Sequence, residues 1–174
     1  CDDGEGNRYI IVMIDNFSHF TFAEQAKSTE AEVAARFIHK VAGITGFPKA
    51  YRWDNCSQFE NHLMRCLLEM IGTESHPSIP FNPQTNGIVE RNIAEIMRHL
   101  RFIVNERRIK TDWSLYLPMV LRILNSEKIA AIGLSPQEIL MPGLDLDRLM
   151  YPEAREKEAK RNISEIEAVL RFRR

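Results

Sequence analysis

The sequence predicts an α/β domain, because short continuous apolar runs alternate with segments whose apolar residues recur at helical spacing. The first run, residues 8–15, reads Arg-Tyr-Ile-Ile-Val-Met-Ile-Asp, the pattern of a buried strand. Residues 28–41 instead place Val33, Phe37 and Val41 four positions apart, as an amphipathic helix does. With 174 residues, of which 44% are hydrophobic and 27% charged, the chain can bury a sizeable core.

The next elements follow in the same alternating order. Residues 19–26 are rich in aromatic and β-favouring side chains and should form a hairpin with the first strand. The helix begins at an N-cap residue, Ser28 or Thr29, and ends near Gly43 and Gly46. Residues 49–53 form a short strand that places Asp54 at its carboxyl end, the edge where open α/β sheets bind their ligands.

The remaining chain reads as mostly helical. Helical spacing predicts helices over residues 58–71, 88–106 and 113–126, and Ser135 followed by Pro136 marks the start of a short one at 136–140. Residues 75–83 contain three prolines and are predicted to be extended or looped. Residues 1–145 thus form the main domain, and the charge-dense residues 146–174 form a helical tail.

Charge and cysteine content exclude several classes of protein. Lys and Arg number 23 against 24 Asp and Glu, so the net charge of −1 argues against a polybasic nucleic-acid binder, although a local basic patch remains compatible. Apolar runs are too short to span a bilayer, and the first residues are acidic, unlike a signal peptide. Cys1, Cys56 and Cys66 have no paired spacing, which favours free thiols in an intracellular, reducing compartment. A zinc site that adds His62 and His76 matches no known ligand spacing.

Two carboxylates occupy positions that suit chemistry. Asp54 ends a predicted strand, and Glu90 lies in the first turn of the predicted long helix. Carboxylate oxygens are suitable ligands for Mg²⁺ or Mn²⁺, and a pair of such ions can promote phosphodiester cleavage. Their spacing alone favours the ordinary interpretation, a turn Asp and a helix-N-terminal Glu.

The surrounding motifs favour the catalytic interpretation, because the chain resembles the catalytic core of retroviral and Ty3/gypsy-type retrotransposon integrases over about residues 6–145. Residues 80–91, Pro-Phe-Asn-Pro-Gln-Thr-Asn-Gly-Ile-Val-Glu-Arg, are close to the most specific motif of that family and end on its catalytic Glu. Residues 52–55, Arg-Trp-Asp-Asn, resemble the strand that carries its second Asp. The opening residues 6–18, together with Trp113 and Leu134-Ser135-Pro136, resemble its first hairpin and later helices.

This resemblance implies an RNase H-like fold, a mixed five-stranded sheet flanked by helices. It implies 3′-processing and strand transfer of DNA, with Asp54 and Glu90 holding Mg²⁺ or Mn²⁺, and a loop at residues 81–87 that positions the DNA end. The residues expected to contact DNA are Asn55, Ser57, Gln58, Asn82, Gln84, Asn86, Arg91 and Arg98.

The family's third carboxylate has no clear counterpart. It lies on a first strand that precedes the hairpin, so either Asp2 fills its place or that strand is truncated in this chain. Asp15 follows the hairpin's first strand here and corresponds to a position that is not catalytic in the family.

Other departures support a second hypothesis, a domesticated and inactive core that serves as a structural or protein-binding subunit. Cys56 replaces a usual Gly, and Ile93, Ala94 and Met97 form an apolar stripe where active relatives carry polar, DNA-facing residues. Such a stripe predicts weak, salt-sensitive DNA binding, and a protein or core contact at Ile93 and Met97.

The resemblance also predicts self-association, as a homodimer or hetero-oligomer. The surfaces expected to form it are the helices at residues 31–41 and 113–126, where Tyr116, Leu117, Val120 and Ile123 supply apolar area. An active integrase would work in the nucleus; for an inactive core the location is open.

Overall fold

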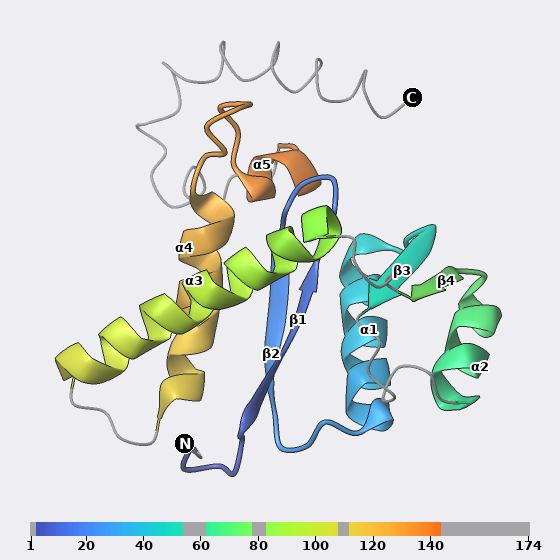
Figure 1. Cartoon of the computed structure of the whole chain (residues 1–174), viewed down its shortest axis with the longest axis horizontal. Helices are drawn as coiled ribbons and strands as arrows, with labels where there is room; N and C mark the ends of the chain where they lie inside the picture. The colour runs from blue at the N-terminus through green and yellow to red at the C-terminus, as the bar shows by residue number, and fades with distance from the viewer. Residues whose placement is uncertain (1–2, 54–61, 78–82, 108–111, 144–174) are drawn as a thin grey trace. The chain divides into compact units, whose positions relative to one another are not determined.

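The computed structural model describes residues 3–53, 62–77, 83–107 and 112–143, with the side chains of residues 75–77, 83–86 and 107 outside the description (Figure 1). The chain divides into two compact units. One comprises Cys1–Met13 and Phe22–Leu121, and the other Ile14–Thr21 and Arg122–Arg174. The domain boundary expected after residue 145 lies outside the described residues and stays a prediction.

The chain opens with the predicted hairpin, β1 (Tyr9–Ile14) and β2 (Thr21–Ala26). The Arg8 N–H donates to the Ala26 carbonyl at 3.0 Å, which closes the open end of the pair. In the connecting turn the Asp15 carboxylate accepts the backbone N–H and the hydroxyl of Ser18, at 2.8 and 2.6 Å. Asp15 is therefore occupied in shaping the turn.

The core of the first unit lies between helices and a parallel strand pair. It is built from α1 (Ala31–Thr45), β3 (Ala50–Trp53), α2 (His62–Ile71) and β4 (Glu74–Pro77), which lie together in Figure 1. Strands β3 and β4 pair in parallel, from Ala50 opposite Glu74 to Trp53 opposite Pro77. The buried cluster that joins these elements consists of Ile38, Tyr51, Met64 and Leu68.

Strand β4 confirms the extended alternative at the start of residues 75–83 and adds that this stretch pairs with β3. Pro77 is the last residue of β4, where the missing N–H of proline interrupts the ladder least. The strand is specified by its neighbours: Glu74 N–H donates to the Lys49 carbonyl, and the Thr73 hydroxyl to the Pro48 carbonyl, both at 3.0 Å. Those contacts are long-range, so the local sequence carries no sign of them.

The long helix α3 spans Pro83–Arg107 and begins five residues before the predicted start at residue 88. Proline is favoured at the first position of a helix, since its absent N–H would be unpaired there in any case. Gln84, Asn86 and Gly87 thus belong to the first turns of a helix, which corrects the expected loop at residues 81–87 for residues 83–87.

The predicted helix at 113–126 is divided into a short 3₁₀ helix, η1 (Trp113–Tyr116), and α4 (Leu117–Ser126). Pro118, the second residue of α4, lacks the N–H that would continue the hydrogen bonding from η1. Helix α5 (Pro136–Leu140) agrees with the prediction. Ser135 and Glu138 form its capping box, with hydrogen bonds of 3.2 and 2.7 Å.

In the second unit, one side chain replaces a strand partner. The Asn125 amide accepts the Thr21 N–H at 2.8 Å and donates to the Thr21 carbonyl at 2.9 Å. Both residues are buried. Asn125 therefore pairs both backbone polar groups of the first β2 residue, which would otherwise be unpaired away from water.

Part of the surface predicted for self-association is core instead. Leu117 and Val120 are 1% and 0% exposed, because α4 turns that face inward. The apolar side chains that do remain exposed on η1 and α4 are Leu115, Met119 and Ile123. The expected exposure is thus wrong for Leu117 and Val120 and confirmed for Ile123, while self-association through this helix stays a prediction.

The described residues establish an α/β fold and contain two two-stranded sheets, and the expected five-stranded sheet stays a prediction. Within the same residues, no helix has the length and apolar content to cross a membrane.

Candidate active site

The two strands of the parallel pair end side by side, and each leads toward one predicted catalytic residue. Trp53 is the last residue of β3, and Asp54 follows it directly in the sequence. Pro77, its partner across the pair, is the last residue of β4, and α3 begins six residues later at Pro83. Chemistry in open α/β sheets is concentrated at this carboxyl edge.

Glu90 is the eighth residue of α3, beyond the first turn in which it was predicted, because the helix begins earlier. Its side chain is exposed. Glu90 makes no hydrogen bond or ion pair with any described residue. Its carboxylate can therefore accept a ligand without first breaking a contact to the described residues.

Most of the other predicted site residues lie outside the description. These are Asp2, Asp54, Asn55, Ser57, Gln58 and Asn82. The backbone of Gln84 and Asn86 belongs to α3, but their side chains are not described. Whether Asp54 and Glu90 converge stays a prediction. Among the described residues, no three His, Cys, Asp or Glu side chains gather as a metal site would require.

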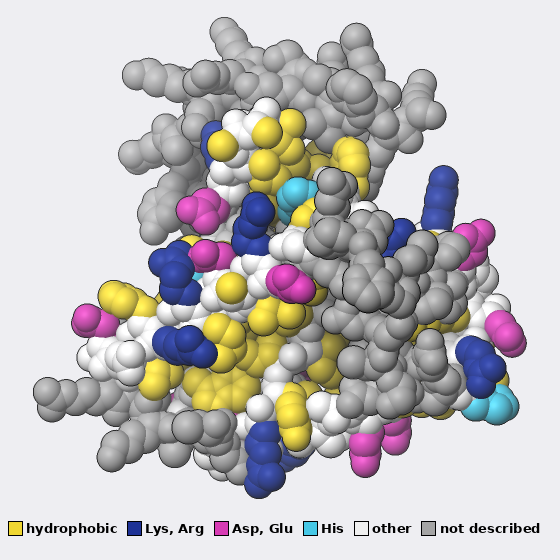
Figure 2. All heavy atoms as spheres, in the orientation of Figure 1, with side chains coloured by type: hydrophobic (Ala, Val, Ile, Leu, Met, Phe, Trp, Pro, Cys, Tyr) yellow, Lys and Arg dark blue, Asp and Glu magenta, His cyan; other side chains and the backbone are white. Residues whose placement is uncertain are grey.

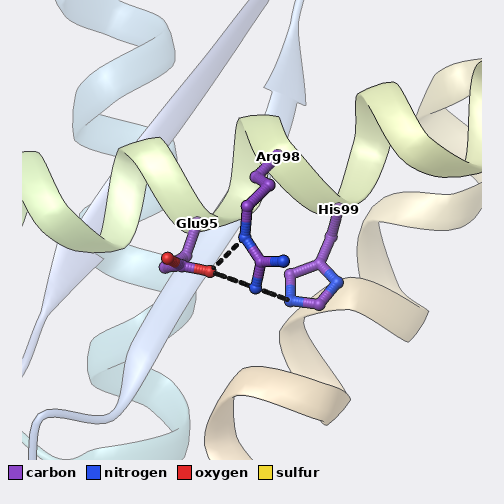
Figure 3. A network of polar contacts seen from close by, with 3 residues as sticks. All are labelled: Glu95, Arg98 and His99. Carbon is purple, nitrogen blue, oxygen red and sulfur yellow. Dashed lines mark hydrogen bonds and ion pairs between the residues drawn. The ribbon is translucent and has the colours of Figure 1, made fainter.

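The two predicted DNA-contacting arginines differ in their surroundings. Arg91 is exposed, next to Glu90. Arg98 donates through Nε and Nη2 to Oε2 of Glu95, at 2.8 and 2.6 Å, and its Nη2 lies 3.3 Å from Nε2 of His99 (Figure 3). All three side chains come from α3. An exposed pair of this kind contributes about 0.2–1 kcal/mol, so a phosphate can compete for Arg98.

The apolar stripe that follows Glu90 is exposed. Ile93 and Met97 are 41% and 37% exposed, and Ala94 between them is exposed as well. Arg91, Arg98 and Arg101 are exposed on the same helix. Of the two outcomes expected for the stripe, burial in the core is therefore wrong and exposure is confirmed, while a partner that covers the stripe stays a prediction.

Sequence reasoning missed a buried carboxylate beside the position considered for the third metal ligand. Asp3 is 4% exposed and accepts hydrogen bonds from the Asn7 N–H and amide, both at 2.7 Å, and from the Glu5 N–H at 3.0 Å. Burial alone would raise the pKa of Asp3, but the hydrogen bonds from Ser114, Asn7 and Glu5 outweigh it and lower the pKa from 3.8 to about 2.

The Asp3 network ties the start of the chain to η1, since Ser114 belongs to that helix. Its carboxylate is fully engaged as a structural acceptor. The Asp-Asp-Gly-Glu-Gly-Asn sequence carried a signal for it, because Asp four residues before Asn suits a turn closed by side-chain hydrogen bonds.

The chain is similar in sequence to a known protein family and to viral polyproteins. Residues 1–83 match the family described as integrase core domain. The chain is 32% identical over 140 residues to the Gag-Pol polyprotein of woolly monkey sarcoma virus, and 32% identical over 137 residues to that of feline leukemia virus. These matches cover 79% and 78% of the chain, but the chain spans only 8% of either polyprotein.

Solved structures show the same fold. The catalytic core domain of BIV integrase superposes with a TM-score of 0.65 at 24% identity, covering 75% of this chain and 84% of that one. A simian T-cell lymphotropic virus intasome, solved in complex with PP2A regulatory subunit B56 gamma, gives a TM-score of 0.70 at 18% identity, covering 78% of this chain and 49% of that one. The resemblance seen in the motifs is thereby confirmed: the chain is similar in sequence to the integrase core domain and shares the fold of a retroviral integrase core.

Proposed function

We propose that this core carries out metal-dependent polynucleotidyl transfer on DNA, as 3′-processing followed by strand transfer. In the first step, water attacks a phosphodiester near the DNA end and displaces the 3′ oxygen, which leaves as a free 3′-hydroxyl. In the second, that hydroxyl attacks a phosphorus of the target strand and displaces another 3′ oxygen. Each step forms one P–O bond and breaks one.

One observation carries the proposal: the parallel ends of β3 and β4 lead to Asp54 and to the helix that bears Glu90. Paired strand ends lie about 4.8 Å apart, so the segments that leave them start from neighbouring points. Glu90 is exposed and has no partner in the part of the chain that the structure describes, which supports its use as a ligand.

The donor set fits Mg²⁺ or Mn²⁺, because both ions prefer carboxylate oxygens. Asp54 and Glu90 would hold the ion, with Asp2 as the candidate third carboxylate. When bound, the ion would lower the pKa of an attacking water and stabilise the leaving oxygen. The neighbouring Asp3 is unsuited to this role, since its carboxylate is buried and saturated with hydrogen bonds.

DNA would be positioned by polar residues around the two carboxylates and by the exposed arginines of α3. Arg91 and Arg98 would bind phosphates, which fix the register of DNA without reading its sequence. The residues proposed for the mouth of the site are Asn55, Ser57, Gln58, Asn82, Gln84 and Asn86. Self-association through α1 and the exposed face of η1 and α4, and a nuclear location, belong to the same proposal.

A second function is favoured by the exposed stripe of Ile93, Ala94 and Met97. Apolar side chains there form no hydrogen bonds to phosphates or bases. Together with the net charge of −1, they suit a domesticated core that holds a protein partner in place of DNA.

The two functions are separated by strand transfer into plasmid DNA, measured with Mn²⁺ and a labelled DNA duplex end. Asp54→Asn and Glu90→Gln should each reduce product at least about 100-fold, because each removes a charged ligand of the ion. Glu106→Gln is the matched control, since Glu106 is an exposed carboxylate on the same helix.

Transfer that is retained in both variants would exclude the proposed catalytic role of the two carboxylates. A correctly folded chain with no transfer, and with tight binding of a protein through Met97, would establish the inactive, protein-binding function.

A further inference from the structure

We propose that Cys66 is a site of reversible covalent modification, at which its thiol exchanges with a small disulfide while His62 takes up the thiol proton. The inference is independent of the proposed function, because it involves neither DNA nor a metal ion. It rests on a nucleophile and a base that the structure brings together on the outer side of α2.

The two side chains come from positions one helical turn apart, which face the same way on a helix. Sγ of Cys66 lies 2.9 Å from Nδ1 of His62, within hydrogen-bonding distance. Among the described residues, neither side chain has another polar partner. When Nδ1 carries no proton it accepts the thiol S–H, so the base lies at the atom that must lose a proton. A nucleophile in contact with a base is the arrangement by which proteins activate a thiol.

Both groups are accessible to a small molecule. His62 and Cys66 are exposed, whereas Met64 and Leu68, on the inner side of the same helix, are buried in the core. Figure 2 shows histidine and charged side chains at the surface along the edge of the molecule where α2 lies. A reagent can therefore approach Sγ without opening the core.

The pair suits thiol chemistry better than metal binding. Zinc sites in proteins are built from three or four side-chain ligands. Within the part of the chain that the structure describes, no third His, Cys, Asp or Glu joins the two in such a group. A thiol with an adjacent base needs no further ligand, because the thiolate is itself the nucleophile.

The exchange balances between the pair and the disulfide. The Cys66 proton passes to Nδ1 of His62, and the thiolate attacks one sulfur of the small disulfide. A new S–S bond to Cys66 forms as the old S–S bond breaks, and the other half leaves as a thiolate that takes the proton from the imidazolium. The sulfur of Cys66 is oxidised while the leaving sulfur is reduced, so no further oxidant is needed. Excess thiol reverses the step.

The expected gain in rate follows from how much thiolate the base provides. An unassisted cysteine is only about 3% ionised at pH 7. Complete proton transfer to a base would raise the thiolate about 30-fold, but a less basic thiolate is also a weaker nucleophile. The net gain from His62 should therefore be about tenfold.

The rate of modification of the full chain tests the role of His62. In a Cys1→Ser, Cys56→Ser background, Cys66 is the remaining cysteine. Its reaction with excess dithiodipyridine is followed by the absorbance of the released thiopyridone, and the adduct is identified by mass. His62→Gln should slow the reaction about tenfold at pH 7, because an amide accepts a hydrogen bond but takes up no proton. At pH 10 the two proteins should react within about twofold of each other, since the thiol then ionises without a base.

A neighbouring charge provides the matched control. Arg65→Gln removes an exposed cation beside Cys66 and should leave the rate at pH 7 within about twofold. Circular dichroism at both pH values checks that each protein is folded. Equal rates of the parent and His62→Gln at pH 7 would overturn the proposal. So would a folded His62→Gln variant that stays tenfold slower at pH 10, because the substitution would then act on access to the thiol and not on its proton.

Discussion

The buried and the exposed polar groups of this core have different roles. Buried groups stabilise the fold, whereas exposed groups can contact a ligand. Asp3 and Asn125 are 4% and 5% exposed; Asp3 closes a local turn and also binds Ser114, and Asn125 binds the backbone of Thr21, which is distant in the sequence. Glu95, Arg98 and His99 lie along one helix, and their contacts with one another stay within about one turn of it (Figure 3). Buried networks are costly to disturb, whereas exposed ones can exchange partners with a ligand.

The largest expected change in stability comes from removing a buried hydrogen-bonding side chain. Asn125→Ala leaves the N–H and the carbonyl of Thr21 unpaired in a buried environment, which should lower the free energy of unfolding by about 2–4 kcal/mol. Urea unfolding measures it. Ser126→Ala, an exposed neighbour on the same helix, should change stability by less than about 0.5 kcal/mol. Equal effects of the two substitutions would show that the Thr21 contact is not needed.

Acid should weaken the buried network through Asp3. Because its pKa of about 2 in the folded chain lies below the ordinary 3.8, the stability it contributes is present above about pH 4 and is lost as the pH falls toward 2. Asp3→Asn should be less stable at pH 7 and should lack this component of the acid dependence. Unfolding curves of the unchanged chain and of Asp3→Asn, measured at pH 7 and pH 3, test this. An equal loss of stability in both proteins on acidification would contradict the proposed role of Asp3.

Substitutions in the exposed network of Glu95, Arg98 and His99 should change DNA binding and leave stability nearly unchanged. Glu95→Gln releases Arg98, so it should strengthen DNA binding, while Arg98→Gln should reduce the slope of log affinity against log salt by about one. Either change should alter the free energy of unfolding by less than about 1 kcal/mol. Fluorescence anisotropy across salt concentrations gives the slope. An unchanged slope in Arg98→Gln would remove Arg98 from the DNA surface.

The smallest effect is expected at the apolar stripe. Met97→Ser should change the free energy of unfolding by less than about 0.5 kcal/mol, because Met97 is 37% exposed and outside the core. A loss of several kcal/mol would mean that the stripe belongs to the core after all.

The same contrast explains what the sequence could predict. Elements fixed by local patterns were predicted closely, among them β1, β2, β3 and α5, whose start was predicted from Ser135 and Pro136. For α1 the predicted N-cap was wrong, since the helix is capped at Glu30 and not at Ser28 or Thr29. The pairing of β4 was missed because long-range contacts through Thr73 and Glu74 define it, and its own sequence contains no apolar run.

The candidate site was predictable in part for a similar reason. The motif around Glu90 indicated the family. The start of α3 at Pro83 was harder to predict, because proline is favoured both at the first position of a helix and in loops. The sequence could not distinguish the buried Leu117 and Val120 from the exposed Met119, because all three are apolar and the fold decides which side of the helix is covered.

Mn²⁺ binding to the full chain tests the central claim most directly, because Asp54 and Glu90 are proposed to share one ion. Titration calorimetry should show that Asp54→Asn and Glu90→Gln each weaken binding at least about tenfold. The double variant should be no weaker than the poorer single one, and Glu106→Gln should bind as the unchanged chain does. Unaltered Mn²⁺ affinity in both single variants would contradict a shared metal site and the catalytic function built on it.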